Sequence, residues 1–537
     1  MAIPGGDASR FYPSAGFFLA LAVFAGVVAI QLSLVRDLAD AVVCAVLVLP
    51  VFDTSLFLFL RLRVLTAPLA DRSAGAPTPV TLPKITFVLP SYREPFDVKT
   101  MTLDSVLAVR YPGPVEIISV DNSPDPDTAD QRRWRDHVAA RGVVFLHNGD
   151  PAASKPGNLD LALSRATGEF VVFVDVDSTL PADPGWLFTA LRDFAAEPGL
   201  GYVQFHVVPT NGHFNQLTEG TARYLHLHNA VEVVAGQGGF AMFKGHNAIW
   251  RRTALDAIGS WREQLDGRII LAEDFVKALH AYRLGYHGRI SWLATGEWIP
   301  SSLAAFTSMW QRWIYGTIQA VAKQRPSALL RSPEFGPFDK IEILRRVKFG
   351  TFVVPYLAFV AAALFPSAVL IPYLLLFAGT LLAGLVAGAR VDASFGRRSR
   401  GGTPLRTHAV AAMAELYVNM IGCFTQLRYI GHRLRRRAPG ASWTLTHKGT
   451  QRRLGFTDAL RRNGAVYASQ GALAAIAAVL LITDSTGPVV VFLRAAALLH
   501  FVAILLMPAC LGRTTRAEDN HAGDATIDPR LELTDVA

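Results

Sequence analysis

Acidic side chains follow several apolar segments of this sequence at the points where those segments end. Asp175 and Asp177 come directly after residues 170–174, and Asp121 comes directly after residues 115–120. Carboxylates two residues apart can share one hard cation, and Mg²⁺ is typically held by one or two carboxylates together with the phosphates of a substrate. The spacing therefore predicts a site that binds a divalent cation and a phosphate-bearing ligand.

A second acidic pair has the position of a helix start. Glu273 and Asp274 follow the apolar residues 269–271. We expect the pair to open a helix, because the positive end of a helix dipole favours ionised carboxylates. A carboxylate placed in this way is a candidate general base if a hydroxyl group of a substrate lies within reach.

These side chains need a scaffold that brings the ends of separate segments together. Short apolar runs at residues 85–90, 115–120, 143–146 and 170–174 alternate with segments of helical character, which is the pattern of buried parallel strands. We expect a doubly wound α/β sheet, in which ligands bind at the carboxyl ends of the strands. The side chains at those ends are Tyr92, Glu94, Asp121, Asp175 and Asp177.

The composition places much of the chain in a membrane. Of its 537 residues, 51% are hydrophobic and 18% are charged, whereas a soluble domain carries about 25% charged residues. The apolar content excludes a wholly disordered protein. Cys44, Cys423 and Cys510 lie too far apart in the sequence for a disulfide framework or a zinc-binding motif.

Six apolar stretches are candidates for membrane spans, since about 20 apolar residues cross a hydrocarbon core. They are residues 11–35, residues 41–60, two stretches within residues 349–389, residues 463–483 and residues 487–511. Residues 61–348 contain no comparable run, so we expect them to form a water-soluble domain.

The net charge of +9 comes largely from arginines beside these stretches, which indicates membrane orientation rather than nucleic-acid binding. The positive-inside rule places the arginine clusters and both termini in the cytoplasm. Residues 403–430 have arginines at both ends, so we interpret them as an amphipathic helix on the cytoplasmic surface. A seventh span, with the later topology inverted, remains the alternative.

The motifs, taken in order, resemble those of a processive family 2 glycosyltransferase of the bacterial cellulose synthase or curdlan synthase-like type. The motifs are residues 91–94, Asp121, residues 155–158, residues 175–177, residues 243–247, residues 273–274, residues 311–313 and residues 443–449. The resemblance covers roughly residues 15–510. It implies a GT-A-like catalytic domain, cytoplasmic in location, inserted in an α-helical transmembrane channel of about six spans.

The resemblance implies a role for each matched residue on the donor side. Tyr92, Glu94 and Asp121 would hold the uracil and the ribose, and Lys155 would help to hold the nucleotide. Asp175 and Asp177 would bind Mg²⁺ or Mn²⁺ and the diphosphate. The remaining donor-side residues are Arg312, which would meet the diphosphate, and Thr446 and Lys448 in a loop that closes over the nucleotide.

On the acceptor side, the resemblance makes Asp274, beside Glu273, the general base for the acceptor hydroxyl. Trp313 would stack on the terminal sugar, and His246 lies in a loop that supports the end of the acceptor. The family pattern Gln-x-x-Arg-Trp has Met309 in the glutamine position, and Gln311 points elsewhere on a helix. A thioether cannot replace the hydrogen bonds of an amide, so this departure affects the register of the acceptor and the linkage made.

Three further polar residues lie on one expected helix, namely His226, His228 and Glu232. His228 and Glu232 are four residues apart and share a face, but His226 does not share it. We therefore interpret the segment as an ordinary polar helix face rather than as a metal site.

The resulting organisation has seven parts. They are two transmembrane helices (1–62), a linker (63–83), the cytoplasmic catalytic domain with interfacial helices (84–335), transmembrane helices three and four (336–402), the amphipathic helix and gating loop (403–462), transmembrane helices five and six (463–512), and a disordered cytoplasmic tail (513–537).

The expected activity is the polymerisation of a β-glucan or a related β-polysaccharide from a nucleotide sugar and its translocation across the bacterial inner membrane. UDP-glucose is the first choice of donor, and UDP-N-acetylglucosamine and GDP-mannose stay open. The expected partners are the donor, the growing polysaccharide, the lipid bilayer and accessory export subunits, with no nucleic acid. The alternatives are a non-processive transferase acting on a lipid carrier and a transporter without catalysis.

Overall fold

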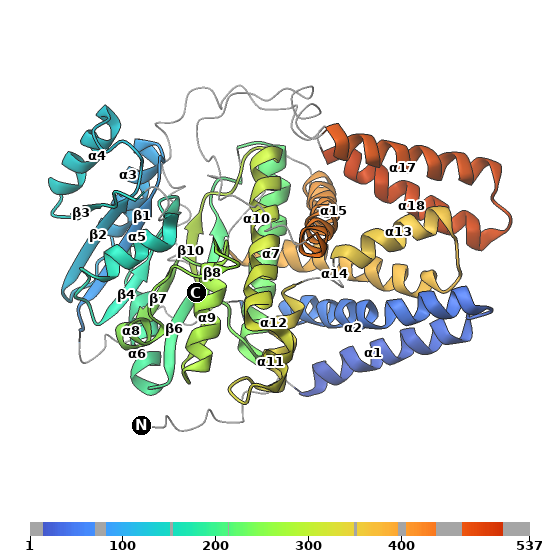
Figure 1. Ribbon diagram of the computed structural model, residues 1–537, viewed down its shortest axis with the longest axis horizontal. Helices are drawn as coiled ribbons and strands as arrows, with labels where there is room; N and C mark the ends of the chain where they lie inside the picture. The colour runs from blue at the N-terminus through green and yellow to red at the C-terminus, as the bar shows by residue number, and fades with distance from the viewer. Residues whose placement is uncertain are drawn as a thin grey trace.

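The computed structural model describes residues 14–69, 82–150, 154–212, 214–347, 352–395, 404–435 and 464–507. These residues form a sheet domain and a set of long apolar helices that extend from one side of it (Figure 1). Most of the expected linker, the whole of the expected loop at residues 443–449 and the tail from residue 513 lie outside the described residues.

The sheet domain alternates strands and helices along the chain. Its main strands are β1 (Ile85–Ser91), β2 (Val115–Asp121), β3 (Val144–His147), β4 (Phe170–Phe173), β5 (Ser178–Thr179), β6 (Leu200–Pro209), β7 (Ala248–Arg251) and β10 (His287–Glu297). A two-stranded sheet adds β8 (Gln264–Leu265) and β9 (Arg268–Ile269). The helices are α3 (Phe96–Leu107), α4 (Ala129–Ala139), α5 (Ser154–Leu163), α6 (Gly185–Ala196), α7 (Gln216–Gly238), α8 (Arg252–Ile258), α9 (Glu273–Arg283), α10 (Leu303–Gln324), α11 (Pro326–Arg331) and α12 (Pro337–Arg345).

The main sheet has the strand order β3-β2-β1-β4-β7-β6-β10-β5. The four strands predicted from the sequence, β1 to β4, are parallel to one another, as expected. However, β7 runs antiparallel to both β4 and β6, so the sheet is mixed and is not a simple doubly wound one. The parallel half of this mixed sheet brings the ends of β1, β2 and β4 to one edge.

Both faces of the sheet are covered by apolar side chains. One layer includes Trp134, Trp186 and Phe194, and the other includes Trp250 and Trp261. Burial on two faces explains why the strands are apolar without interruption rather than alternating. Because the strands cannot shift without losing this packing, the ends that carry polar side chains are held in fixed positions.

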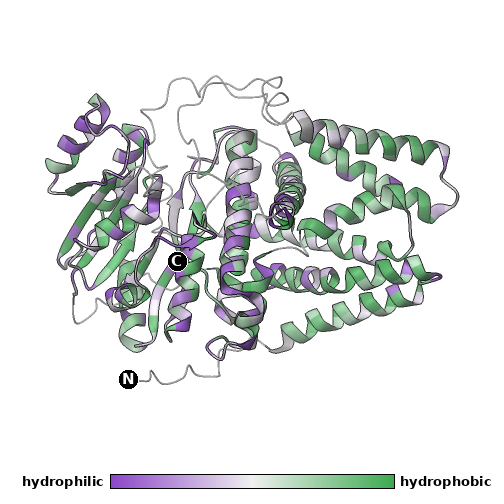
Figure 2. Ribbon diagram, viewed as in Figure 1, coloured by the Kyte–Doolittle hydropathy of each residue, from purple (hydrophilic) through white to green (hydrophobic). Residues whose placement is uncertain are grey.

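Each of the six expected apolar stretches contains a helix. They are α1 (Ser14–Ser33), α2 (Leu38–Thr66), α13 (Val354–Leu364), α14 (Leu370–Ser394), α17 (Gly464–Thr483) and α18 (Pro488–Leu506). Figure 2 shows these helices as apolar on all visible sides. By length and composition, α2, α14, α18 and residues 405–434 are able to cross a membrane, and α1, α13 and α17 contain shorter apolar segments.

Residues 404–434 form one long helix, α15 (Pro404–Leu434). This helix packs against α7 and α10 of the sheet domain as well as against α18. In Figure 1 it is seen nearly end-on, whereas α2, α17 and α18 run across the view. It therefore crosses the direction of these other apolar helices.

Several arginines to which the sequence analysis applied the positive-inside rule are not surface charges. Arg61 is 1% exposed and pairs with Glu415, and Arg346 is 6% exposed and pairs with Glu232. Arg390 donates a 2.9 Å hydrogen bond to the Ala67 carbonyl at the end of α2. These arginines join the apolar helices to one another and to the sheet domain.

The pairing of β10 with β6 leaves no space for a side chain at Gly288. A Cβ atom at this position would overlap the ring of Tyr202, which is fully buried and stacks on Trp250 with ring centroids 4.4 Å apart. We expect Gly288→Ala to destabilise the fold by about 1–3 kcal/mol, the usual cost of overpacking. Thermal unfolding of the purified protein measures the effect.

Gly149→Ala is the matched control for this variant, because a Cβ atom at residue 149 meets no atom within 4 Å. An unfolding temperature for Gly288→Ala equal to that of the control would contradict the packing described for Tyr202.

Candidate active site

The ammonium group of Lys155 lies at the centre of an acidic cluster beside the strand ends. Its Nζ atom is 2.6 Å from Asp175 Oδ1 and donates a 3.1 Å hydrogen bond to the Gly245 carbonyl. Burial lowers the pKa of Lys155, but the carboxylates of Asp175, Glu273 and Asp274 outweigh it and hold that pKa above its usual value. Lys155 thus joins α5, the end of β4 and the loop before β7.

A cavity of ≈ 1120 Å³ surrounds this cluster. Most of the site residues expected from the sequence line it, namely Tyr92, Glu94, Lys155, Asp175, Asp177, His246, Glu273, Asp274, Met309, Arg312 and Trp313. Thr446 and Lys448 lie outside the described residues. The cavity thus brings together side chains that are up to 221 positions apart in the sequence, from Tyr92 to Trp313.

Asp121 is the one described candidate that does not line the cavity. It is fully buried, and it accepts hydrogen bonds from Ser91 Oγ at 2.6 Å and from the Ser123 backbone at 2.7 Å. Its neighbour Asn122 lines the cavity instead and accepts a 2.9 Å hydrogen bond from Asn158. In this conformation Asp121 fixes the loop after β2, whereas the expectation was direct contact with a ligand.

Asp175 and Asp177 extend from the end of β4 into the cavity wall. Two carboxylates with this spacing fit a hard divalent cation whose coordination is completed by phosphate oxygens. Within the described ranges, no group of three or more His, Cys, Asp and Glu side chains is arranged to hold a metal ion alone. The donor set is therefore suited to a cation that arrives with a phosphate-bearing ligand.

Glu273 and Asp274 are the first two residues of α9, as the sequence predicts. Asp274 Oδ1 accepts a 2.7 Å hydrogen bond from the Phe275 backbone, and Gly245, with φ of 85°, lies against the other oxygen. Burial, followed by the charge of Asp274, raises the pKa of Glu273 to about 7, and burial also raises the pKa of Asp274. The pair is therefore poised to take up a proton near neutral pH.

One face of α10 forms another part of the cavity wall. Met309 is buried, Trp313 is 37% exposed, and Gln311 is exposed on the part of the helix that does not line the cavity. Trp310 also lines the cavity, and its ring lies 5.2 Å from that of Trp313. The sequence analysis did not include Trp310, although its position three residues before Trp313 places it on the same helix face.

The loop before β7 contributes two further side chains. His246 Nε2 lies 3.4 Å from Glu297 Oε2, and its Nδ1 lies 3.8 Å from Asp175 Oδ2. Lys244 donates a 2.9 Å hydrogen bond to Asn229, and burial lowers the pKa of Lys244 to about 8. Glu297 and Lys244 were not among the predicted site residues, although Glu297 ends the strand β10 and Lys244 lies within the motif that contains His246.

The interpretation of α7 as an ordinary polar face is wrong for two of its residues. His226 is fully buried with Nδ1 2.8 Å from Asp392 of α14, and Glu232 is 2% exposed and pairs with Arg346. These partners lie more than 100 positions away in the sequence, so helix periodicity alone could not identify them. His228 lines the cavity.

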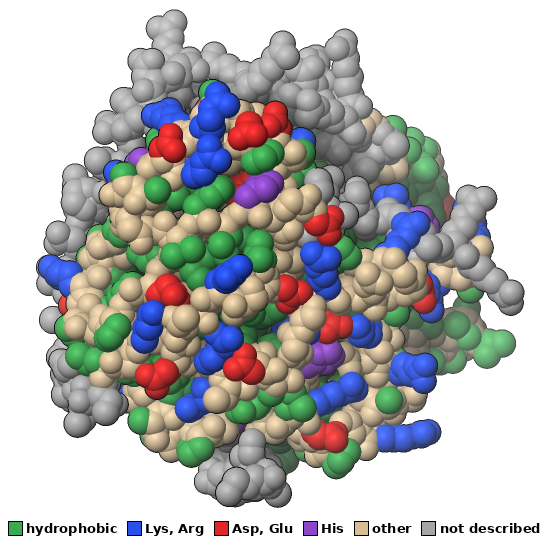
Figure 3. Space-filling model, turned by 60° about the vertical axis from the view of Figure 1, so that its left-hand side comes forward, with side chains coloured by type: hydrophobic (Ala, Val, Ile, Leu, Met, Phe, Trp, Pro, Cys, Tyr) green, Lys and Arg blue, Asp and Glu red, His purple; other side chains and the backbone are tan. Residues whose placement is uncertain are grey.

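On the face shown in Figure 3, the described acidic and basic side chains are interspersed among apolar ones. No large region of that described face carries charge of a single sign. This face therefore lacks the continuous basic surface that binds a nucleic-acid backbone.

Residues 170–387 match the family model "Glycosyl transferase family group 2". A probable glucomannan 4-beta-mannosyltransferase 6 from Oryza sativa is 27% identical over 46% of this chain and 43% of its own length. The cellulose synthase catalytic subunit [UDP-forming] of Xanthomonas axonopodis is 26% identical over 45% of this chain and 33% of its own length.

A third relative is the beta-monoglucosyldiacylglycerol synthase of Synechocystis, which is 27% identical over 30% of this chain and 34% of its own length. The chain therefore spans less than half the length of each of these curated relatives.

The environment of Glu94 gives a prediction about stability. Burial, with added repulsion from Asp177 and Asp121, raises the pKa of Glu94 from 4.5 to about 8. The folded state then keeps a proton that the unfolded state has lost, so stability falls as pH rises from about 4.5 to 8. Glu94→Gln removes this loss of stability. We therefore expect the unfolding temperature of the variant to rise relative to that of the parent as pH rises through that range.

Asp104→Asn, which removes an exposed carboxylate outside the cavity, is the control for this pH series. Parallel curves for the parent and Glu94→Gln from pH 5 to 8 would be inconsistent with the raised pKa of Glu94.

Proposed function

We propose that this chain is a membrane-embedded inverting enzyme, because residues 170–387 match the family model "Glycosyl transferase family group 2". It polymerises a β-glucan or a related β-polysaccharide from a nucleotide sugar and moves the product across the inner membrane. The UDP-forming cellulose synthase subunit among the relatives favours UDP-glucose as the donor, and the mannosyltransferase relatives keep a mannose donor open.

One observation carries this proposal. A single cavity of ≈ 1120 Å³ is lined by Asp175 and Asp177 after β4, by Asp274 at the start of α9, and by Arg312 and Trp313 of α10. The two aspartates after β4 suit a diphosphate with its cation. Asp274 suits a hydroxyl group that must lose a proton, and Trp313 suits the apolar face of a sugar ring. A glycosyl transfer needs these three functions side by side.

In the proposed reaction, Asp274 accepts the proton of an acceptor hydroxyl group. At the same time, the oxygen of that hydroxyl group forms a bond to the anomeric carbon of the donor sugar. The bond between that carbon and the diphosphate oxygen breaks, and the nucleoside diphosphate leaves with the bonding electron pair. Lys155 and Arg312 stabilise the negative charge that develops on the leaving group. Attack from the face opposite the leaving group inverts the configuration.

Asp175 and Asp177 would hold Mg²⁺ or Mn²⁺ at the diphosphate, and the cation would supply neutralisation of the departing charge. Tyr92, Glu94 and Asn122 at the strand ends are the residues placed to meet the base and the ribose. We propose that the loop containing Thr446 and Lys448 closes over the nucleotide, as in the family that the sequence resembles.

A second candidate is transfer of a single sugar to a lipid acceptor, which the name of the diacylglycerol-modifying relative favours. Both candidates use the same donor site. They differ in the product, because a polymerase returns long chains whereas a single-transfer enzyme returns a glycolipid with one added sugar.

The enzyme assay that tests the proposal uses the purified full-length protein with labelled UDP-glucose, UDP-N-acetylglucosamine or GDP-mannose and Mg²⁺ or Mn²⁺. We expect nucleoside diphosphate release with one of these donors. Asp274→Asn should lower that release by about 100-fold or more while nucleotide affinity changes little, the scale of a lost general base.

Glu219→Gln, on α7 and outside the cavity, is the control for the loss of a carboxylate. Normal turnover by Asp274→Asn would remove this residue from the reaction, and the length of the product separates the polymerase from the glycolipid synthase.

The proposed placement in the membrane also has a test. If α15 lies on the cytoplasmic surface, reporter fusions after Ser394 and after Arg435 should both report the cytoplasm, and a fusion after Thr483 should report the opposite side. Opposite locations for the first two fusions would make α15 a span.

A further inference from the structure

One face of α10 extends beyond the active-site cavity and lies against the segment that leads into α9. Met309 and Arg312 line the cavity. Gly316 and Gln319 follow them at intervals of three or four residues, so the four positions share one side of the helix. The helix that carries the acceptor-side residues therefore also reaches the segment before the acidic pair of α9.

Gly316 and Gln319 contact the backbone of that segment directly. Gln319 is 4% exposed, and its Oε1 atom accepts a 3.1 Å hydrogen bond from the Leu271 backbone N–H. A Cβ atom at Gly316 would lie 2.7 Å from the Ala272 nitrogen and 2.9 Å from the Leu271 carbonyl carbon, which is closer than van der Waals contact allows. Glycine at residue 316 thus permits the two backbones to approach, and the Gln319 side chain joins them.

A further turn of α10 adds a contact farther back along the same segment. Lys323 is ion-paired with Glu263. The Glu263 carbonyl accepts a 2.9 Å hydrogen bond from the Ile270 backbone N–H, which ties this contact to the residues before α9. Residues 263–272 are therefore held against successive turns of α10.

The start of α9 receives no side-chain hydrogen bond from its own N-cap residue. That residue is Ala272, and alanine is among the poorer N-cap residues. Glu273 and Asp274 are the first two residues that follow it. Because the local sequence does not fix the helix start, the contacts from α10 determine where Asp274 lies.

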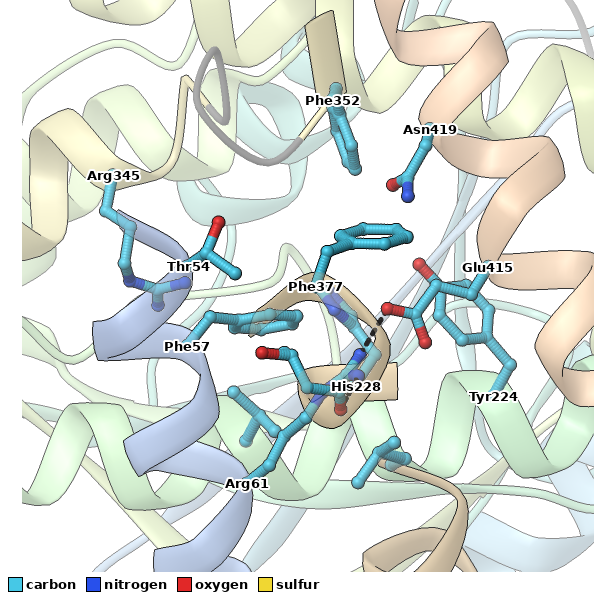
Figure 4. A pocket seen from close by; sticks show the side chains of 13 residues that line it. Thr54, Phe57, Arg61, Tyr224, His228, Arg345, Phe352, Phe377, Glu415 and Asn419 are labelled. Atoms are coloured by element: carbon cyan, nitrogen blue, oxygen red, sulfur yellow. Dashed lines mark hydrogen bonds and ion pairs between the residues drawn. The ribbon is translucent and has the colours of Figure 1, made fainter. Parts of the chain in front are cut away.

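Helix α10 is anchored independently of α9. Thr307 Oγ1, near the beginning of α10, lies 2.9 Å from the Tyr417 hydroxyl group of α15. Helix α15 is in turn tied to α2 by the 2.6 Å ion pair between Glu415 and Arg61 (Figure 4). Helix α10 can therefore act as a fixed reference for the segment that it touches.

Resting on the proposed function, we infer that Gly316 and Gln319 are positioning residues for the base, Asp274. Through the backbone of residues 271–272 they hold the start of α9 at a fixed place relative to Trp313, which lies one turn earlier on α10. The carboxylate that takes the proton and the ring that holds the acceptor sugar are thus placed by one helix. This precision matters because a misplacement of about 1 Å can lower a rate by about 100-fold.

Two variants disturb this contact in different ways. Gln319→Met removes the oxygen that accepts the Leu271 hydrogen bond and nearly keeps the volume of the side chain. Gly316→Ala keeps both groups of that hydrogen bond but pushes the Ala272 backbone away. Neither Gly316 nor Gln319 lines the cavity, so both variants leave the side chains of the cavity in place.

Each variant has a matched control away from the site. Gln31→Met makes the same change at a fully buried glutamine, whose Nε2 atom donates a 3.0 Å hydrogen bond to the Val369 carbonyl. Gly220→Ala makes the same change at a helix glycine of α7, where the added Cβ atom would overlap Val410 of α15. Neither Gln31 nor Gly220 lines the cavity.

The full-length proteins are supplied with labelled UDP-glucose or GDP-mannose, whichever the parent turns over. Label transferred to a glycan or glycolipid is measured separately from label released as the free sugar, for which water replaces the acceptor. We expect both α10 variants to lower the kcat of transfer by about 10- to 100-fold, with little change in donor KM or nucleotide affinity. The ratio of transfer to hydrolysis should also fall, because water is not held by Trp313, and both controls should keep the parent ratio.

A parent-like ratio of transfer to hydrolysis in either α10 variant would overturn the inference. An equal fall in the matched controls would do so too, since it would reflect a general loosening of the helices. Loss of nucleotide binding along with transfer in both α10 variants would show that these residues support the fold rather than the base. If the proposed function itself fails, the parent shows no donor turnover, which distinguishes this case from the others.

Discussion

The contact between Lys155 and Asp175 is the interaction on which the site depends. Without the ammonium group, the carboxylates of Asp175, Glu273 and Asp274 would share one cavity with little compensation, and like charges in a buried space repel strongly. Lys155 also binds the Gly245 carbonyl, so the same group positions the loop that lies against Asp274. The carboxylate after β4 and the acidic pair at the start of α9 are therefore linked through one cation.

Buried ion pairs also attach the sheet domain to the apolar helices. Arg223 and His226 of α7 both contact Asp392 of α14, and Arg346 contacts Glu232. Arg61 extends this pattern between α2, α14 and α15. Buried ion pairs add little stability relative to apolar packing, but breaking one partner is costly, so such pairs specify one arrangement of the helices. The acceptor wall formed by α10 is held against α15 within this arrangement.

The sequence was sufficient for the features that depend on local pattern. The apolar runs gave β1, β2, β3 and β4 with their parallel pairing, and the acidic pair at residues 273–274 gave the start of α9. The antiparallel strand β7 was not predicted, because a four-residue apolar segment carries no information about its direction. Similarly, periodicity on α7 identified polar residues but could not show that Asp392 and Arg346 bury them.

The sequence also could not show which polar side chains face the cavity and which are buried beneath it. Asp121 follows an apolar strand in the same way as Asp175, yet hydrogen bonds to Ser91 and Ser123 hold it beneath the cavity, and Asn122 takes the surface position. Trp310 and Glu297 lie at the cavity although no motif marks them. Which of two adjacent polar residues faces a ligand depends on the turn that follows the strand, and that turn is set by tertiary contacts.

The central claim is that the cluster around Lys155 receives a nucleoside diphosphate together with a divalent cation. Titration of the purified full-length protein with UDP and with GDP, in Mn²⁺ and then in excess chelator, tests it directly. The account predicts binding of one nucleotide that requires the cation and is lost in both Lys155→Met and Asp177→Asn. Binding that is equally tight in the chelator, or that survives in both variants, would contradict it.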